Sequence, residues 1–391
     1  MKKSYEIDMC NGPLLGKILV FSIPLMLSGI LQLLFNAADI IVVGRFAGST
    51  ALAAVGSTAS LINLMINVFV GLSVGVNVLA ARYYGAQKEK DIQDTVHTAI
   101  MMAILSGLFL VVLGESASKP MLTLMGTPDD VLDQAALYLR IYFFGMPVLM
   151  IYNFGAALLR AVGDTRRPLY FLFAAGAVNV VLNLFFVIQL GMGVDGVAWA
   201  TVISECVSAG LIIRSLMKEN GAMKLHLTKL RIVSGKLTQI VRVGLPAGMQ
   251  GAIFSISNVL IQSSINSFGS IAMAGSTASA NVEGFVYNAM NAVYQTTLSF
   301  TSQNYGAGKM DRVTKILLDC LGLVVLVGVV MGGGAVLLGP KLLQIYSSDP
   351  EVISYGMMRM RIINGSYFLC GIMDTMVGGL RGLGYSVVPM L

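Results

Sequence analysis

The sequence predicts an all-α polytopic membrane protein, built from two parallel six-helix repeats that form two lobes. Three observations indicate this fold class. Only 12% of the 391 residues are charged and 56% are apolar, whereas a soluble domain carries roughly 25% charged residues. Apolar runs long enough to cross a bilayer recur along the whole chain. Short motifs occur twice, about 221 residues apart.

The composition excludes several classes of protein. The chain has only 26 basic and 20 acidic residues, too few to cover a soluble protein of this length. A cytosolic enzyme, a disordered chain and a nucleic-acid binder are therefore excluded. We expect membrane lipids as surroundings, no nucleic-acid partner, no catalytic residues, no bound metal and no cofactor.

Ten apolar runs account for the predicted helices. A transmembrane helix needs about 20 mostly apolar residues, and lipid leaves the backbone no hydrogen-bond partner outside the segment, so runs of this length form helices. The predicted transmembrane helices are residues 17–43, 54–81, 95–117, 135–159, 168–190, 194–215, 239–266, 273–301, 313–338 and 353–380.

Lysine and arginine set the orientation. With the N-terminus inside, 20 of the 26 basic residues fall in inner segments, while the outer loops hold only Arg45, Lys119 and Lys341. Basic residues concentrate on the cytoplasmic side of membrane proteins. We therefore expect a multi-pass protein of the cell (plasma) membrane with a cytoplasmic N-terminus.

Internal repetition predicts the two lobes. GSTAS occurs at 56–60 and again at 275–279, and Tyr-Gly-Ala at 84–86 recurs at 305–307. The first copy contains six predicted helices, an even number, so both copies enter the membrane in the same direction. This is the pattern of parallel repeats related by an axis along the membrane normal.

The repeat also predicts the domain boundaries. The N-terminal lobe covers 1–215, a basic cytoplasmic linker covers 216–238, and the C-terminal lobe covers 239–391. The second copy stops at Leu391, at the start of its fifth helix. About 10 of the 12 expected transmembrane helices are then present, and we expect the second repeat to be truncated.

Several motifs, found at matching positions in both copies, resemble a known transporter family. They are Asn36-x-x-Asp39 with Gly44, the repeated GSTAS, Gln303-Asn304-x-Gly306-Ala307, and Leu159-Arg160-Ala161-x-Gly163-Asp164-x-Arg166-x-Pro168. Together they resemble the multidrug and toxic compound extrusion (MATE) family, and the resemblance covers the whole chain. It implies a twelve-helix, two-lobed secondary antiporter, monomeric, that exports cationic organic compounds in exchange for protons or sodium.

Among the carboxylates inside predicted helices, four are singled out as candidates: Asp39, Glu205, Glu283 and Asp374. An ionisable side chain in the bilayer is costly and marks a functional candidate. We expect no basic side chain at comparable depth. An acidic interior suits a cation or a proton and disfavours an anion carrier. Glu205 is expected to serve interhelical hydrogen bonding instead.

Asp39 is the first candidate for ion coupling. Gln32 and Asn36 precede it at helical spacing, so the three side chains share a face and could line a cavity and share hydrogen bonds. The resemblance assigns the helix-1 aspartate a coupling role. The alternative is a solvated, structural aspartate near the outer helix end.

Asp374 is the second candidate. It shares a helix face with Tyr367, and its counterpart in the first repeat is Asn153. The resemblance implies a cation ligand here, as in the sodium-coupled branch of the family. That branch also has a glutamate on helix 7, where this sequence reads Phe254-Ser255. Proton coupling is therefore favoured over sodium. Structural hydrogen bonding remains the alternative.

Glu283 is the third candidate, on the most polar predicted helix. Tyr287, Asn288 and Asn291 lie near it along that helix, and such a helix must face a wet cavity or another polar surface. Glu283 could take a proton or contact a cationic substrate, or could simply be solvated.

Helix 7 adds Asn258 and Gln262, which are expected to face the Glu283 helix or to form interhelical hydrogen bonds. The function predicted is export of small cationic compounds in exchange for protons or sodium. Two alternatives stay open, a flippase for lipid-linked precursors in the same superfamily and a non-transporting fragment. A flippase would need basic residues in its cavity.

Overall fold

The computed structural model describes residues 5–391, and within that range every element is helical. The α-helices are α1 (Leu14–Val42), α2 (Ser49–Gly85), α3 (Glu89–Leu124), α4 (Asp129–Phe144), α5 (Met146–Ala161), α6 (Arg166–Leu184), α7 (Val194–Lys218), α8 (Ser234–Asn266), α9 (Ser270–Gly306), α10 (Met310–Gln344), α11 (Pro350–Gly382) and α12 (Val387–Met390). Wider π-helical turns extend α1 and α6 at their C-terminal ends.

Each predicted helix corresponds to a helical segment of the structure, with one difference of shape. The predicted helix 135–159 is two helices, α4 and α5, bent by 48° at Gly145. Pro147 lies in the first turn of α5 and has no N–H with which to continue the α4 hydrogen-bond ladder. The equivalent α11 has no proline after Pro350 and is unbroken.

The count of ten transmembrane helices is not confirmed. By length and composition, seven helices of the described chain could cross a membrane, or eight if α4 and α5 form one bent span. Neither α9 nor α11 is among them, since both carry many polar side chains along their length. The early end of the second repeat stays a prediction.

The repeat is visible in the backbone. Gly48 and Gly269 precede α2 and α9 with φ values of +92° and +95°. Gly163 and Gly384 follow α5 and α11 with φ values of +93° and +98°. A left-handed conformation at these points suits glycine, so both copies make the same turns with the same residue type.

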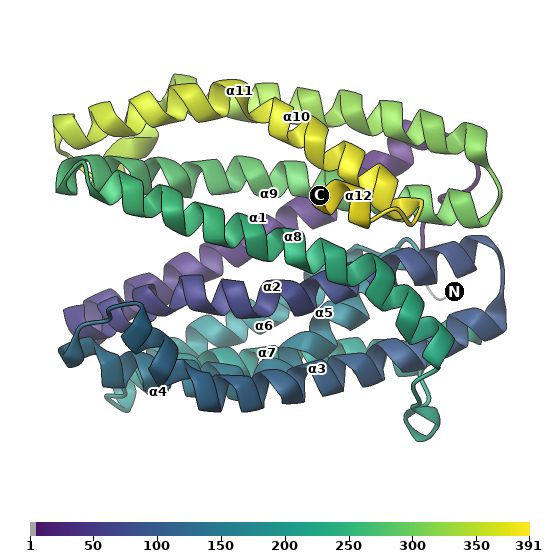
Figure 1. The fold of residues 1–391 in the computed structure, drawn as a ribbon, viewed down its shortest axis with the longest axis horizontal. Helices are drawn as coiled ribbons and strands as arrows, with labels where there is room; N and C mark the ends of the chain where they lie inside the picture. Colours follow the sequence, from purple (N-terminus) through teal and green to yellow (C-terminus); the bar gives the residue numbers. More distant parts are fainter. Residues whose placement is uncertain (1–4) are drawn as a thin grey trace.

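The buried side chains form two large clusters, one mainly from α2–α7 and one mainly from α9–α11. Figure 1 shows these groups on opposite sides, with α1 and α8 running obliquely between them. Ile18 and Phe21 of α1 belong to the second cluster, whereas Val42 belongs to the first. Ile240 of α8 belongs to the first cluster. Thus α1 and α8 each start on the other repeat's side.

The two sides meet closely at one end of the bundle. A Cβ at Gly85 would lie 2.0 Å from Gln303 O, and one at Gly306 would lie 1.9 Å from Arg82 O. These reciprocal contacts cross α2 over α9 near their C-terminal ends. We call this end, where α2, α5, α7 and α9 finish, the basic end, because it carries the predicted inner loops.

The N-terminal segment ties both sides together at the basic end. Asn304 Nδ2 donates to Met9 O at 3.1 Å, and Lys309 Nζ donates to Cys10 O at 3.0 Å. On the other side, a Cβ at Gly163 would lie 2.4 Å from Ile7 O. Residues 5–12 therefore bridge the two repeats.

Toward the opposite end the two sides separate. Gly71 of α2 lies against Gly248 of α8, where an added Cβ would be 2.2 Å from the Gly248 backbone. The same side of α2 continues about three to five turns earlier as Ser60, Gly56 and Ala53, and these residues are exposed. The bundle is therefore closed at the basic end and open at the opposite end.

The predicted linker does not form a separate unit. His226 N donates to His97 Nε2 at 3.2 Å, Val233 N donates to Thr98 Oγ1 at 3.1 Å, and Arg231 pairs with Asp94 at 2.6 Å. These contacts hold the segment against the first turns of α3. The lobe boundaries at residues 215 and 239 stay a prediction.

Candidate functional site

Asp39 lies half-buried on the C-terminal half of α1, against α6. The approach is close because Gly176 of α6 leaves room for Phe35; a Cβ there would lie 1.8 Å from the Phe35 ring. Asn183 Nδ2 of α6 donates to Asp39 Oδ1. Among the described residues, no basic side chain pairs with Asp39.

A chain of polar side chains extends from Asp39 into the first lobe. Asn183 Nδ2 also donates to Asn179 Oδ1 at 3.1 Å, and Asn179 Nδ2 donates to Thr201 Oγ1 of α7 at 3.4 Å. Asn179 and Asn183 are buried. This network links α1, α6 and α7, and it offers oxygen atoms but no positive charge.

Sequence reasoning missed the two asparagines. Gln32 and Asn36, expected to share hydrogen bonds with Asp39, are exposed on α1, and the described hydrogen bond to Asp39 comes from Asn183. The available signal was the spacing of Asn179 and Asn183, four residues apart in an otherwise apolar helix. Such a pair points to one helix face.

Asp374 lies half-buried on α11, in a second group of candidate residues. The rings of Tyr287 and Tyr367 stack with centroids 6.4 Å apart, joining α9 to α11. Arg381 lies two turns beyond Asp374 and acts on its carboxyl electrostatically. This second group therefore contains a carboxylate, two phenols and a nearby cation.

The expectation that basic side chains are absent at comparable depth is wrong at two places. Arg359 donates from Nε and Nη2 to both oxygens of Glu283, at 3.0 and 2.9 Å. Arg381 is buried and donates to Tyr294 Oη at 2.8 Å and to Gln250 Oε1. The long arginine side chains reach inward from residues that the loop pattern had placed near helix ends.

Glu283 therefore has a basic partner that its sequence context does not reveal. Its carboxylate also accepts from Ser279 Oγ at 2.8 Å, and Arg359 Nη1 donates to Ser276 Oγ at 2.8 Å. Only 7% of the Glu283 side chain is exposed. This arrangement holds the carboxylate as a salt bridge between α9 and α11, and its coupling role stays a prediction.

The remaining candidates take several positions. Asn288 of α9 lies against α1, where a Cβ at Gly29 would be 2.8 Å from its Oδ1. Asn291 accepts from Gln295 at 2.9 Å within α9. Asn153 of α5 donates to Leu149 O at 3.0 Å. The last two candidates, Asn258 and Gln262, lie at exposed positions on α8.

Two helical lobes that meet at one end and part at the other, with carboxylates at least half-buried in each, define the class of two-lobed membrane transporters. The family model of MatE matches residues 24–185 and 246–391. The chain belongs to the MatE family, the MATE transporters, whose members are transporters and not enzymes. It is a multi-pass membrane protein.

Individual relatives agree with this assignment. The "Probable multidrug resistance protein YoeA" of Bacillus subtilis is 28% identical over 95% of this chain and 81% of that protein. The "FAD transporter" of Shewanella oneidensis is 24% identical over 93% and 81%. The solved outward-facing conformation of a multidrug resistance MATE family transporter of the MOP superfamily matches with a TM-score of 0.92 at 22% identity, over 100% of this chain and 87% of that chain, a likeness of fold.

Proposed function

We propose that this chain exports organic cations across the cell membrane in exchange for protons, and that Asp39 carries the exchange. One observation carries the proposal: Asp39 lies within a helix able to cross the membrane, and its only described partner is an uncharged amide. An ionised carboxylate in that setting is costly without a positive charge. A proton or a cation supplies one.

The exchange follows because a proton and an organic cation compete for the carboxylate of Asp39. When Asp39 is ionised, the cavity between the lobes attracts an organic cation. When a proton reaches Asp39, that attraction is lost and the cation leaves. The observed separation of the lobes, at the end away from the basic loops, corresponds to the state that releases the cation outside. The basic end is then the cytoplasmic end.

Sodium is the second candidate for the coupling ion. The side chains of Asp39, Asn179, Asn183 and Thr201 form one hydrogen-bonded group, and each carries an oxygen atom. Carbonyl oxygens are common sodium ligands in transporters. Asn183 Oδ1 is buried and has no hydrogen-bond partner among the described residues. Phe254 and Ser255 on α8 supply no carboxylate for a sodium site in the second lobe.

An anionic substrate is the second candidate function, and a specific observation favours it. The sequence argued against a lipid-linked precursor flippase because it predicted no basic residue in the interior. Arg381 lies buried on α11, so that objection no longer holds. A relative named as an FAD transporter also carries an anionic compound. FAD is therefore tested beside organic cations in proteoliposomes.

The test is ethidium efflux from bacteria that lack their own efflux pumps. We expect the wild-type chain to lower ethidium accumulation, and we expect Asp39→Asn, or a protonophore, to abolish this. The exposed Asp311→Asn at the start of α10 is the matched control and should export normally. Efflux that survives without sodium supports proton coupling.

Four outcomes would contradict the proposal. Equal efflux by wild type and Asp39→Asn would remove Asp39 from the mechanism. Loss of efflux in sodium-free medium would assign the coupling to sodium. In proteoliposomes, transport of FAD but of no cation would favour the anionic alternative, and no transport of any compound would favour the non-transporting one.

A further inference from the structure

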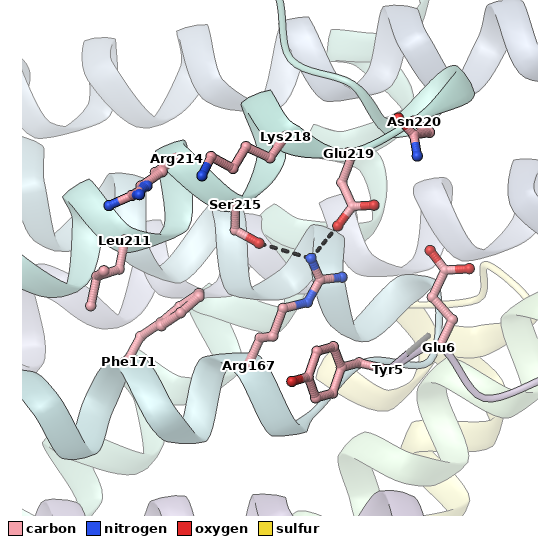
Figure 2. Close-up of a pocket in the computed structure, with 10 residues that line it drawn as sticks. All are labelled: Tyr5, Glu6, Arg167, Phe171, Leu211, Arg214, Ser215, Lys218, Glu219 and Asn220. Carbon is pink, nitrogen blue, oxygen red and sulfur yellow. Dashed lines mark hydrogen bonds and ion pairs between the residues drawn. The ribbon is translucent and has the colours of Figure 1, made fainter. Parts of the chain in front are cut away.

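A cavity of about 910 Å³ lies at the basic end, beside the start of α6. Asp39 lies near the other end of that helix, where it contacts Asn183. The cavity is formed by the first turns of α6, the last turns of α7 and the segment before α1. Its lining residues are Tyr5, Glu6, Arg167, Phe171, Leu211, Arg214, Ser215, Lys218, Glu219 and Asn220 (Figure 2). None of them belongs to the proposed exchange mechanism.

On one side of the cavity, Arg167 is already paired with neighbouring polar side chains. Arg167 donates to Ser215 Oγ at 2.8 Å and forms ion pairs with Glu219 and with Asp164. The Tyr5 ring lies 5.8 Å from the Arg167 guanidinium carbon. This network neutralises the charge of Arg167 and holds α6 and α7 together. Arg167 therefore shapes the cavity wall but has no unpaired charge to offer a ligand.

Two cations of the lining are not engaged in this network. Arg214 and Lys218 are four residues apart on α7 and project from the same side of the helix (Figure 2). The described hydrogen bonds and ion pairs include neither side chain. Leu211 and Phe171 lie on the same side of the cavity in Figure 2. This side thus combines two free cations with an apolar floor.

We infer from the surrounding helices that this side lies at a lipid boundary. Both α6 and α7 are long and apolar enough to cross a membrane. At this end both helices also expose large apolar side chains on the surface of the bundle, including Tyr170 and Phe173 on α6 and Met217 on α7. A ligand held by Arg214 and Lys218 would therefore have its apolar part in the bilayer.

We propose that this cavity binds the phosphate group of an anionic phospholipid at the cytoplasmic face. Arg214 and Lys218 hold the phosphate, and Phe171 and Leu211 contact the start of the acyl chains. Basic pockets between transmembrane helices on the cytoplasmic side suit anionic headgroups. Asn220, on the far side of the cavity, offers an acceptor to headgroup hydroxyls such as those of phosphatidylglycerol.

Lipid titration of the purified full chain in detergent, read by native mass spectrometry, tests this. Phosphatidylglycerol, zwitterionic phosphatidylcholine and inorganic phosphate are compared. Each basic side chain near an anionic lipid surface contributes on the order of 1 kcal/mol, so Arg214→Gln with Lys218→Gln should weaken phosphatidylglycerol binding about 10- to 30-fold. Phosphatidylcholine should bind no better to the wild type than to this variant.

Arg242→Gln with Lys315→Gln is the matched control. It removes one arginine and one lysine that are also exposed near the basic end but do not line the cavity, and it should leave phosphatidylglycerol binding unchanged. An equal loss in both double variants would overturn the site. Competition by inorganic phosphate alone, at the affinity of the lipid, would overturn the lipid assignment.

A second measurement locates the lipid directly. Trp199 is the only tryptophan, so Phe171→Trp in a Trp199→Phe background gives one fluorophore at the cavity floor. Phosphatidylglycerol with brominated acyl chains should quench it, and the Arg214 and Lys218 substitutions should reduce that quenching. Quenching that is unchanged by these substitutions would contradict the proposal. Neither assay depends on transport.

Discussion

Asp39 and Glu283 are both carboxylates inside the helix bundle, but their partners give them different chemistry. Asp39 accepts from the amide of Asn183, whereas Glu283 accepts two hydrogen bonds from Arg359. A carboxylate already paired with a guanidinium gains little from a further cation. Asp39 is therefore the better candidate for exchange, and Glu283 the better candidate for joining α9 to α11.

The Glu283 pair predicts a clear stability difference. Breaking a buried ion pair leaves one charge uncompensated and costs about 3 kcal/mol or more. Arg359→Met should therefore lower the thermal midpoint of the purified protein. Adding Glu283→Gln to that variant should restore most of the loss. A double variant no more stable than Arg359→Met would show that Arg359 stabilises the protein by other contacts.

The stability of the N-terminal segment should depend on pH through Glu6. Burial raises the pKa of the Glu6 carboxyl above its ordinary 4.5, although Tyr84 Oη donates to it at 3.1 Å. A raised pKa means that the folded state binds the proton more tightly, so this contribution to stability is lost as pH rises from 4.5 through the raised pKa. Hydrogen exchange of residues 5–12 should then speed up beyond its intrinsic pH dependence.

Glu6→Gln is the control for this effect. The amide carries no charge, so the corrected exchange rates of the segment should stay flat over the same pH range. If wild type and Glu6→Gln respond equally to pH, another group governs the segment.

At the residue scale, the sequence identified the carboxylates and missed their partners. Asp39, Glu283 and Asp374 stand out because charges are rare in apolar helices. Asn183 does not, since an amide in an apolar helix costs less and points to no particular neighbour. The sequence pattern put Arg359 near the end of a predicted helix. Its flexible side chain nevertheless reaches back toward the centre of the bundle.

At the element scale, the crossing of α2 and α9 is a close backbone contact between the two sides of the molecule. Gly85 and Gly306 bring each helix onto the other's backbone, a use of small residues that is common between membrane helices. Gly85→Ala should force the helices apart. Overpacking of this kind costs about 1–3 kcal/mol, which shifts the equilibrium from the closed state toward opening by about fivefold or more.

Cys10 reports this opening. It is half-buried, with Sγ 3.7 Å from Gln303 Oε1. With the other cysteines replaced by serine, a maleimide should modify Cys10 faster in Gly85→Ala than in the parent. Gly322→Ala on α10 is the control, because an added Cβ there meets open space. Equal rates in all three proteins would mean that the crossing does not hold the basic end closed.

The element scale also marks how far hydropathy can predict. Each apolar run that hydropathy selected is helical in the structure, but α9 and α11 are not among the helices apolar enough to cross a membrane. Hydropathy could not foresee the bend between α4 and α5, where Pro147 interrupts one continuous apolar run. Nor could it foresee that α1 and α8 cross between the clusters, because hydropathy identifies a span without identifying its neighbours.

At the scale of the whole molecule, the internal repeat predicted the architecture, and the lobe separation came only from the structure. Ala53 of α2 and its repeat counterpart Ala274 of α9 are both exposed near the open end. Spin labels at these two positions should give long, broad distances in the resting protein. Alternation between two states predicts that an added organic cation shifts part of the population to shorter distances.

A distance distribution that never changes, under any substrate or pH, would contradict this alternation. Labels at two positions within α2 serve as the control, since one helix should keep its internal distance in every state.

The most direct test of the central claim is a proton count. If a cation and a proton compete for Asp39, adding ethidium to the purified protein in weak buffer, at a pH low enough that Asp39 starts protonated, should release about one proton per cation bound, the value for a simple exchange at one carboxyl. Asp39→Asn should release none, while Asp374→Asn should still release protons. Ethidium binding to the wild type without any proton release would contradict the account.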